Sequence, residues 1–134
     1  MTHLDTSYLV DLLRETRRDE PGPASALLET LSEEPLGVSV HVACELHAGA
    51  ALSESPEVER ASVDALLAAL QVVPPDEGFP ARYGQVLAQL RKRGQSISTM
   101  DLLIATAALG DGATLVTRNA RDFDRVPGLI VQGY

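Results

Sequence analysis

The stretch STMDLLIATAALGDGATLVT, residues 98–117, predicts a helix that leads directly into a strand. Ser98 and Asp101 form the S-x-x-D variant of a capping box, which marks the start of a helix. The apolar run continues to Leu109, where glycines are expected to end the helix. TLVT at 114–117 then has the composition of a short buried strand. A helix followed closely by a strand is the repeating unit of parallel α/β sheets.

The same alternation runs through the rest of the sequence. Strands are expected at 2–5, 36–40, 71–74, 114–117 and 129–132, and helices are expected from Tyr8 onward and over 24–34, 42–52, 56–69, 79–93 and 99–109. The predicted fold class is therefore α/β, with a central, mainly parallel β-sheet flanked by helices on both faces. At 134 residues, the chain is expected to form a single domain, 1–134.

The composition limits the classes of protein that are compatible with the chain. No apolar run approaches the roughly 20 residues of a membrane span, and the first residues lack the features of a signal peptide. A cytoplasmic protein with no membrane partner is therefore expected. The net charge of −8 argues against nucleic-acid binding through the overall field, so such a role needs a local patch or a bound metal. The single cysteine, Cys44, excludes an internal disulfide and is expected to be a buried packing residue.

Four acidic residues occupy related places in this pattern. Asp5 ends the first strand, Glu45 lies in the Ala-rich helix, Asp101 lies in a first helical turn, and Asp122 follows the fourth strand. Singly, Asp5 and Asp101 could just satisfy backbone donors at helix starts, whereas Glu45 is costly to bury among apolar neighbours without a cation. Strand ends and the helix starts beside them converge on one edge of a parallel sheet, so the four acids are expected to meet there.

Carboxylates that are packed together repel one another, and without a cation some of them would take up protons. A divalent metal resolves this conflict. Because the candidate ligands are oxygens without any Cys-His spacing, Mg²⁺ or Mn²⁺ is favoured over zinc. One such ion, or a pair about 4 Å apart, orients a phosphate and helps to deprotonate the attacking water. The predicted chemistry is phosphodiester hydrolysis.

Four segments carry a resemblance to a known family. They are LDTSYLVDLL (4–13), VSVHVACELHAGA (38–50), MDLLIATAAL (100–109) and GATLVTRNARDFDRVPGLIV (112–131). Over nearly its whole length the chain resembles the PIN-domain ribonucleases, and most closely the VapC-type toxins of bacterial type II toxin–antitoxin systems. The chain departs from the family pattern at Val42, Cys44 and Thr106, which lie outside the acid set.

The resemblance implies a set of site residues. The metal-binding and catalytic acids would be Asp5, Glu45, Asp101 and Asp122. Thr6 and Asn119 match polar positions that support the acids through hydrogen bonds. Asp124 is the alternative to Asp122, but Asp122 precedes Phe123 in the N-x-x-D-F pattern and is preferred.

The resemblance also implies an activity and partners. The chain would be a Mg²⁺- or Mn²⁺-dependent endoribonuclease, the toxin of a VapBC-type pair, bound by a cognate antitoxin and self-associated as a homodimer. A groove between the first two helices, carrying Leu9, Leu12 and Leu13 on one of them, is expected to take an amphipathic helix of the antitoxin. Arg118 and Arg121 are candidate contacts to the RNA backbone, with Arg125 and the basic run 91–94 as further candidates. These basic residues could equally offset nearby acids or form solvated helix ends.

Two other functions are compatible with a small α/β fold that has an acidic pocket. A phosphoacceptor receiver domain would need paired acids after the first strand and a lysine after one of the last strands, and the only lysine here is Lys92. A catalytically inactive PIN-like module that only binds a partner is the second alternative. The presence of all four acids disfavours the inactive module. An assay of RNA cleavage decides between an active ribonuclease and the inactive module.

Overall fold

A computed structural model of the chain describes residues 1–31 and 33–134. Its elements, in chain order, are β1 (Thr2–Leu4), α1 (Thr6–Arg18), α2 (Pro23–Thr30), β2 (Leu36–Ser39), α3 (Val40–Ala51), α4 (Pro56–Ala68), β3 (Gln71–Val73), α5 (Phe79–Lys92), α6 (Thr99–Gly110), β4 (Thr114–Val116), α7 (Ala120–Phe123) and β5 (Ile130–Gln132). Strands and helices alternate as the sequence predicts.

The strands form one sheet in the order β3-β2-β1-β4-β5, and every neighbouring pair is parallel. The central strand β1 pairs with β2 on one side and with β4 on the other. His3 lies opposite Gly37 of β2 and opposite Leu115 of β4. Since the chain proceeds from β1 to β2 on one side and later returns to β4 on the other, the strand order reverses between β1 and β4. The crevice outside the carboxyl ends of two such strands is the usual ligand-binding place in open α/β sheets.

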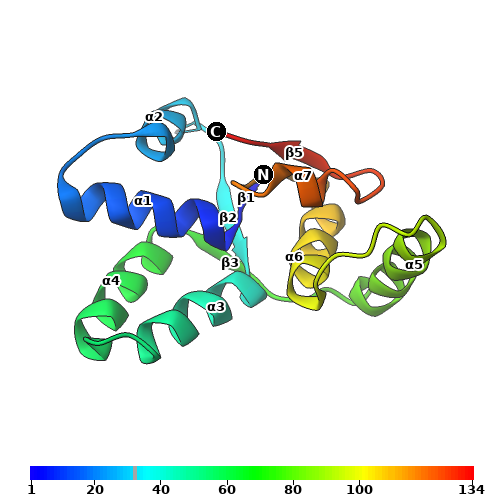
Figure 1. Ribbon diagram of the computed structural model, residues 1–134, viewed down its shortest axis with the longest axis horizontal. Coiled ribbons are helices and arrows are strands. Elements are labelled where there is room, and N and C mark those ends of the chain that lie inside the picture. Colours follow the sequence, from blue (N-terminus) through cyan, green and yellow to red (C-terminus); the bar gives the residue numbers. More distant parts are fainter. Residues whose placement is uncertain (32) are drawn as a thin grey trace.

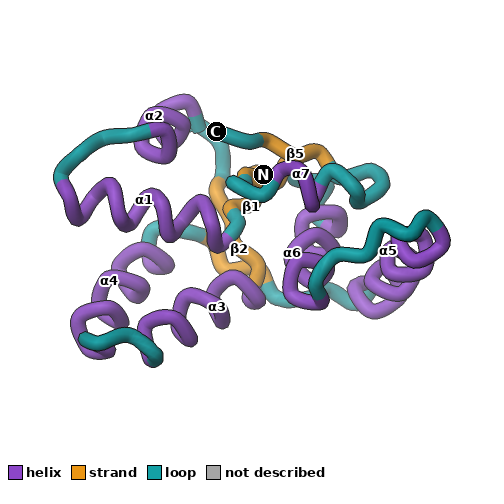
Figure 2. The backbone as a smooth tube through the Cα atoms, in the orientation of Figure 1, coloured by secondary structure: helices purple, strands orange, loops and turns teal. Residues whose placement is uncertain are grey.

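Helices cover both faces of the sheet, which confirms the predicted architecture. Figure 1 shows the sheet nearly edge-on, with α1 to α4 on one side and α5 and α6 on the other. The strands are short segments enclosed by much longer helices (Figure 2). Buried side chains from both layers, among them Leu9, Leu102, Ile104 and Leu115, form a continuous hydrophobic core. Within the described residues, the structure contains no helix that is long and apolar enough to cross a membrane.

Local capping sets the start of the helices that lie nearest the reversal point. The Ser98 side chain accepts a hydrogen bond from the Asp101 amide at 3.2 Å, as its S-x-x-D pattern predicts. Ser39 caps α3 in the same way, through the amide of Val42. At the other end of α6, Gly112 has a φ of 59°, a left-handed conformation that glycine adopts without steric cost.

Several boundaries differ from the sequence-based expectations. Each strand is one residue shorter than predicted, α1 begins at Thr6 rather than Tyr8, and α2 ends at Thr30. Part of the predicted helix end, Ser32, lies outside the described residues. The short helix α7 was not predicted, because four residues are too few to show an apolar period.

Cys44 is exposed, so the prediction that it is buried was wrong. The buried face of α3 carries Val42, Ala43, Leu46 and Ala50, and Cys44 falls outside this face. The surrounding alanines made α3 look apolar on all sides in the sequence, whereas only one side packs against the sheet.

The Glu15 side chain of α1 binds the start of α2. The Glu15 carboxylate accepts hydrogen bonds from the backbone amides of Gly22, Ala24 and Ser25 at 2.7, 3.0 and 2.9 Å. It replaces the missing cap of α2, because the residue before that helix is Gly22. Burial opposes the charge, but the hydrogen bonds from Ser25, Ala24 and Gly22 together lower the pKa of Glu15 below its ordinary value of 4.5.

We predict that Glu15→Gln lowers the melting temperature at neutral pH, because an amide holds the three backbone N–H groups less well than a carboxylate. The pKa of Glu15 is lowered on folding, so its contribution is complete above the ordinary pKa of 4.5 and is lost as the pH falls below that value. Thermal unfolding of both proteins as a function of pH tests this. A gap between the two melting temperatures that is unchanged well below pH 4.5 would contradict the assignment.

Candidate carboxylate site

The candidate site lies where the strand order reverses, at the carboxyl ends of β1 and β4. Asp5 follows β1 directly, and its amide donates a hydrogen bond to the Val116 carbonyl of β4 at 2.9 Å. Thr117 follows β4. The parallel pairing of β1 with β4 therefore places the ends of both strands side by side.

The Asp5 carboxylate is almost fully buried, with 3% of the residue exposed. Its Oδ2 accepts hydrogen bonds from the hydroxyls of Ser7 and Thr117, both at 2.7 Å. In the described part of the chain this carboxylate does not cap α1, so a capping role does not account for it. The sequence-based site omitted Ser7 and Thr117, although both are hydroxyl residues within three positions of the end of a central strand.

Glu45 reaches the same region from α3 and is half-buried. Its Oε1 accepts a hydrogen bond from the Thr6 hydroxyl at 2.6 Å. Consecutive residues of α1, Thr6 and Ser7, thus bind two different acids, Glu45 and Asp5. The first turn of α1 fixes both carboxylates relative to each other.

Asp101 lies in the first turn of α6, and the charges of the other three acids affect its pKa. Its pKa is raised above the ordinary value of 3.8, first by burial and next by the charge of Asp5. The hydrogen bond with Ser98 acts in the opposite direction, and the charges of Glu45 and Asp122 raise the pKa further. The four predicted acids therefore share one electrostatic field.

Asp122 and Asp124 differ in their relation to this field. Asp122 is half-exposed on α7 and is one of the charges that raise the pKa of Asp101. Asp124 is exposed at the end of α7. The electrostatic coupling to Asp101 favours Asp122 as the fourth acid.

Asn119 contacts the fourth acid through the main chain. Its carbonyl accepts a hydrogen bond from the Asp122 amide at 3.1 Å, and its own amide donates to the Thr117 hydroxyl at 2.9 Å. The loop from β4 to α7 is therefore tied at one end to the hydroxyl that binds Asp5.

The predicted RNA-contacting arginines have different surroundings. Arg118 pairs with Asp11 at 2.9 Å, and Arg125 lies 3.8 Å from Asp122 and donates to a backbone carbonyl. Arg121 is exposed on α7, and the basic run 91–94 is exposed at the end of α5. Arg118 and Arg125 therefore each offset the negative charge of a nearby acid, which is the alternative role predicted for these basic residues.

The chemistry of the donors fits a hard divalent cation. Among residues 1–31 and 33–134, no three His, Cys, Asp or Glu side chains are already packed closely enough to hold a metal ion. Burial and the charges of the other three acids nevertheless raise the pKa of Asp101, and a cation would offset both effects. Carboxylate oxygens oriented by hydroxyl groups are the ligands that Mg²⁺ and Mn²⁺ prefer.

Comparisons with known proteins agree on one family. A family model described as the PIN domain matches residues 3–129. The chain is 32% identical over 99 residues to ribonuclease VapC2 of Rickettsia felis, which is 74% of either protein. It is 33% identical over 90 residues to the tRNA(fMet)-specific endonuclease VapC of Salmonella typhimurium, which is 67% of this chain and 68% of that relative.

The crystal structure of VapBC2 from Rickettsia felis bound to a DNA fragment from their promoter contains a similar chain. The two chains superpose with a TM-score of 0.88 at 29% identity, over 99% of this chain and 98% of the other. The agreement extends over the sheet and the helices on both of its faces.

We predict that Asp101→Asn raises the melting temperature of the metal-free protein at neutral pH. The pKa of Asp101 is raised on folding, so its ionised form destabilises the folded state above that pKa. Below the ordinary pKa of 3.8 the side chain is protonated in both states, and the gain disappears. Thermal unfolding in EDTA measures the effect, with the exposed Asp124→Asn as the control. A lower melting temperature for Asp101→Asn at neutral pH would show that the four acids do not repel one another as described.

Proposed function

The chain belongs to the PIN-domain family, and we propose that it is a metal-dependent endoribonuclease, the toxin of a VapBC-type toxin–antitoxin pair. The observation that carries this proposal is the buried Asp5 carboxylate at the point where the strand order reverses, held by the hydroxyls of Ser7 and Thr117. Glu45 is held next to it by Thr6, and the pKa of Asp101 is raised first by burial and further by the charges of Asp5, Glu45 and Asp122. The relatives that are named ribonuclease and tRNA(fMet)-specific endonuclease support RNA as the substrate. The proposed location is the cytoplasm.

In this proposal Asp5, Glu45, Asp101 and Asp122 hold Mg²⁺ or Mn²⁺. When bound, the ion would orient the scissile phosphate, lower the pKa of the attacking water and stabilise the leaving oxygen. The protein's own contribution is to hold the acids in place before substrate arrives.

Three hydroxyl groups provide this positioning. Ser7 and Thr117 fix the Asp5 carboxylate, and Thr6 fixes that of Glu45. Fixed carboxylates need no rearrangement when the substrate binds, which is the main source of electrostatic catalysis. Supporting hydrogen bonds of this kind typically contribute about tenfold to a hundredfold to metal affinity or activity.

We predict that Asp5→Asn or Asp101→Asn lowers the rate of metal-dependent RNA cleavage by roughly a hundredfold or more, since each removes a charged ligand. The assay compares RNA cleavage with Mg²⁺, with Mn²⁺ and with EDTA. Asp124→Asn is the matched control, because it removes one acid that neighbours Asp122 in the sequence but is exposed at the end of α7.

The outcomes separate the possible functions. Cleavage by Asp5→Asn at the wild-type rate contradicts the proposed site. A wild-type protein that cleaves no RNA with either metal, yet binds a partner, supports the inactive module. A rise in the wild-type melting temperature on adding Mg²⁺ without RNA is expected if the site binds the ion in the folded state.

We also propose that the chain binds a cognate antitoxin and forms a homodimer. The structural neighbours in complex with antitoxins, such as VapBC2 from Rickettsia felis, support the antitoxin. The position of its groove differs from the sequence-based expectation. The cavity between α1 and α2 is lined largely by charged side chains, because Leu9 and Leu12 are buried in the core instead.

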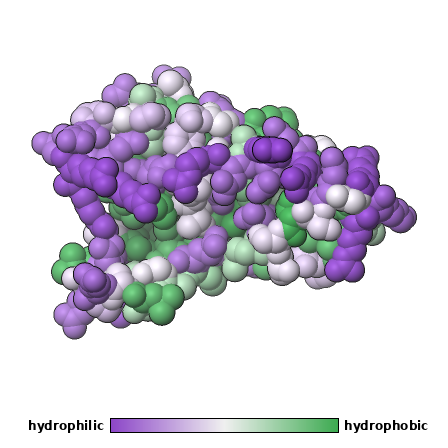
Figure 3. Space-filling model, in the orientation of Figure 1, coloured by the Kyte–Doolittle hydropathy of each residue, from purple (hydrophilic) through white to green (hydrophobic). Residues whose placement is uncertain are grey.

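The apolar groove lies between α1, α3 and α4. Its volume is about 310 Å³, and its apolar lining consists of Val10, Leu13, Leu46, Ala50 and Val63. Figure 3 shows this side of the molecule hollowed between its upper and lower parts, with hydrophobic side chains in the depth. Thr6 and Glu45 also line the groove, so an amphipathic helix seated there would reach the carboxylate site.

We predict that Leu13→Asp weakens the complex with a protein encoded beside this chain by roughly tenfold or more, because a carboxylate would face the apolar side of the partner helix. The control is Val58→Asp, which places the same charge at a side chain that is 66% exposed and outside the groove. Co-purification and growth with and without the neighbouring gene are the measurements.

RNA cleavage by Leu13→Asp should persist, which shows that the variant is folded. Equal loss of the complex in Leu13→Asp and Val58→Asp would contradict the groove. Equal growth and equal RNA cleavage with and without the neighbouring gene would contradict the toxin–antitoxin pair and leave the nuclease untouched.

A further inference from the structure

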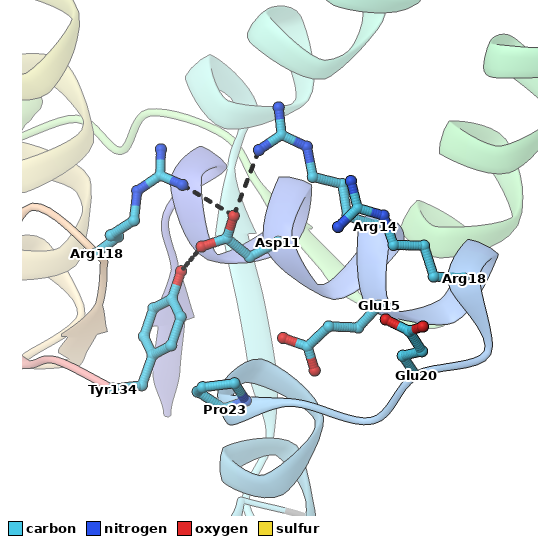
Figure 4. Close-up of a pocket in the computed structure, with 8 residues that line it drawn as sticks. All are labelled: Asp11, Arg14, Glu15, Arg18, Glu20, Pro23, Arg118 and Tyr134. Carbon is cyan, nitrogen blue, oxygen red and sulfur yellow. Dashed lines mark hydrogen bonds and ion pairs between the residues drawn. The ribbon is translucent and has the colours of Figure 1, made fainter.

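A second cavity, of about 440 Å³, lies beside the carboxylate site. We call it the arginine cavity, because Arg14, Arg18 and Arg118 line it together with the C-terminal Tyr134 and three acids. Figure 4 shows these side chains arriving from α1, from the segment after β4 and from the end of the chain. A chain of net charge −8 thus concentrates three of its 11 basic residues around one hollow.

The arginine cavity is connected to Asp5 by two hydrogen bonds. The amide of Arg118 donates to the Ser7 hydroxyl at 3.0 Å, and that hydroxyl donates to the Asp5 carboxylate at 2.7 Å. Arg118 also follows Thr117, the other residue that binds Asp5. Arg118, which lines the arginine cavity, is therefore adjacent in sequence to Thr117, which binds Asp5 in the carboxylate site.

Asp11 holds the cavity lining in place. One of its oxygens accepts a hydrogen bond from Arg118 at 2.9 Å, and the other accepts one from the Tyr134 hydroxyl at 2.6 Å. Arg14 lies 3.8 Å from the same carboxylate. The Tyr134 ring packs edge-on against Tyr8, with centroids 5.1 Å apart. Two guanidinium groups thus face one carboxylate, and Arg118 keeps donors that Asp11 does not use.

The other two acids of the arginine cavity, Glu15 and Glu20, lie near Pro23, where α2 begins (Figure 4). Glu15 already accepts three backbone N–H groups at the start of α2. Glu20 and Arg18 are both exposed at the far end of the cavity. Arg14 and Arg118 share the carboxylate of Asp11, so their two positive charges exceed the one negative charge with which they pair.

An RNA strand carries one negative charge per nucleotide. A metal ion held by the four acids would bind the scissile phosphate, but the neighbouring phosphates need cations of their own. We propose that the arginine cavity binds phosphate groups of the RNA strand next to the scissile one, through Arg14, Arg18 and Arg118. This inference rests on the proposed ribonuclease function. It extends that function by assigning the side of the carboxylate site along which the bound RNA strand continues.

The experiment measures the affinity for RNA and its dependence on salt. A short fluorescent oligouridylate is titrated, with Mg²⁺ present, into Asp101→Asn protein, which is expected not to cleave it. Arg14→Ala and Arg18→Ala are added to this background, and Arg60→Ala is the matched control. Arg60→Ala also removes one positive charge from an exposed helix position. The Arg60 side chain is 74% exposed and lies outside the arginine cavity.

Each cavity variant is expected to weaken binding about threefold to tenfold and to reduce the slope of log affinity against log salt by about 0.7, the value for one phosphate contact on a single strand. Arg60→Ala should change neither quantity. Arg14→Lys and Arg18→Lys should recover most of the salt slope, since they restore the charge. Far-ultraviolet circular dichroism of every variant verifies that it is folded.

Two failures are distinguishable. If wild-type protein cleaves RNA but the cavity variants bind the oligouridylate as Arg60→Ala does, the arginine cavity does not bind RNA and the nuclease proposal stands. If Arg18→Ala keeps its RNA affinity and loses the complex with the adjacently encoded protein, the cavity belongs to a protein interface and the inference is overturned. Arg14→Ala is left out of this comparison, because Arg14 also lines the apolar groove. If the wild type cleaves no RNA, the proposed function itself fails.

Discussion

Asp5 is an almost fully buried carboxylate, and the cost of burying its charge has to be met by the groups around it. The hydroxyls of Ser7 and Thr117 meet part of this cost from two sides. Ser7 is only two residues from Asp5, but Thr117 follows β4, so the bond from Thr117 requires that β1 and β4 be neighbours in parallel register. The sheet topology and the position of Asp5 are therefore one constraint. The rest of the site is built outward from it.

Helix α1 serves three surfaces at once. Its first turn fixes Asp5 and Glu45 through Ser7 and Thr6. Further along, Leu13 faces the apolar groove and Asp11 faces the arginine cavity. A partner helix in the groove and an RNA strand in the cavity would thus both contact α1, and Arg14, which lines both hollows, would lie between them.

The overall charge and the proposed activity are compatible because charge is distributed unevenly. The acids Asp5, Glu45, Asp101 and Asp122 share one field, which suits a divalent cation but repels RNA on its own. Arg14 and Arg118 lie next to these acids and pair with Asp11, which is not one of the four. Composition alone argued against binding RNA through the overall field, and it left open a local patch of this kind.

The sequence by itself determined what depends on neighbours in the chain. Caps such as Ser98 and the apolar period of the helices act over a few residues, and they predicted the parallel α/β sheet. Only the tertiary structure decided which groups surround those acids. Thr117 binds Asp5 across 112 positions and Arg118 binds Asp11 across 107, distances at which local pattern carries no information. The exposed side of Cys44 and the location of the groove were decided in the same way, because which face of a helix is covered depends on the elements that pack against it.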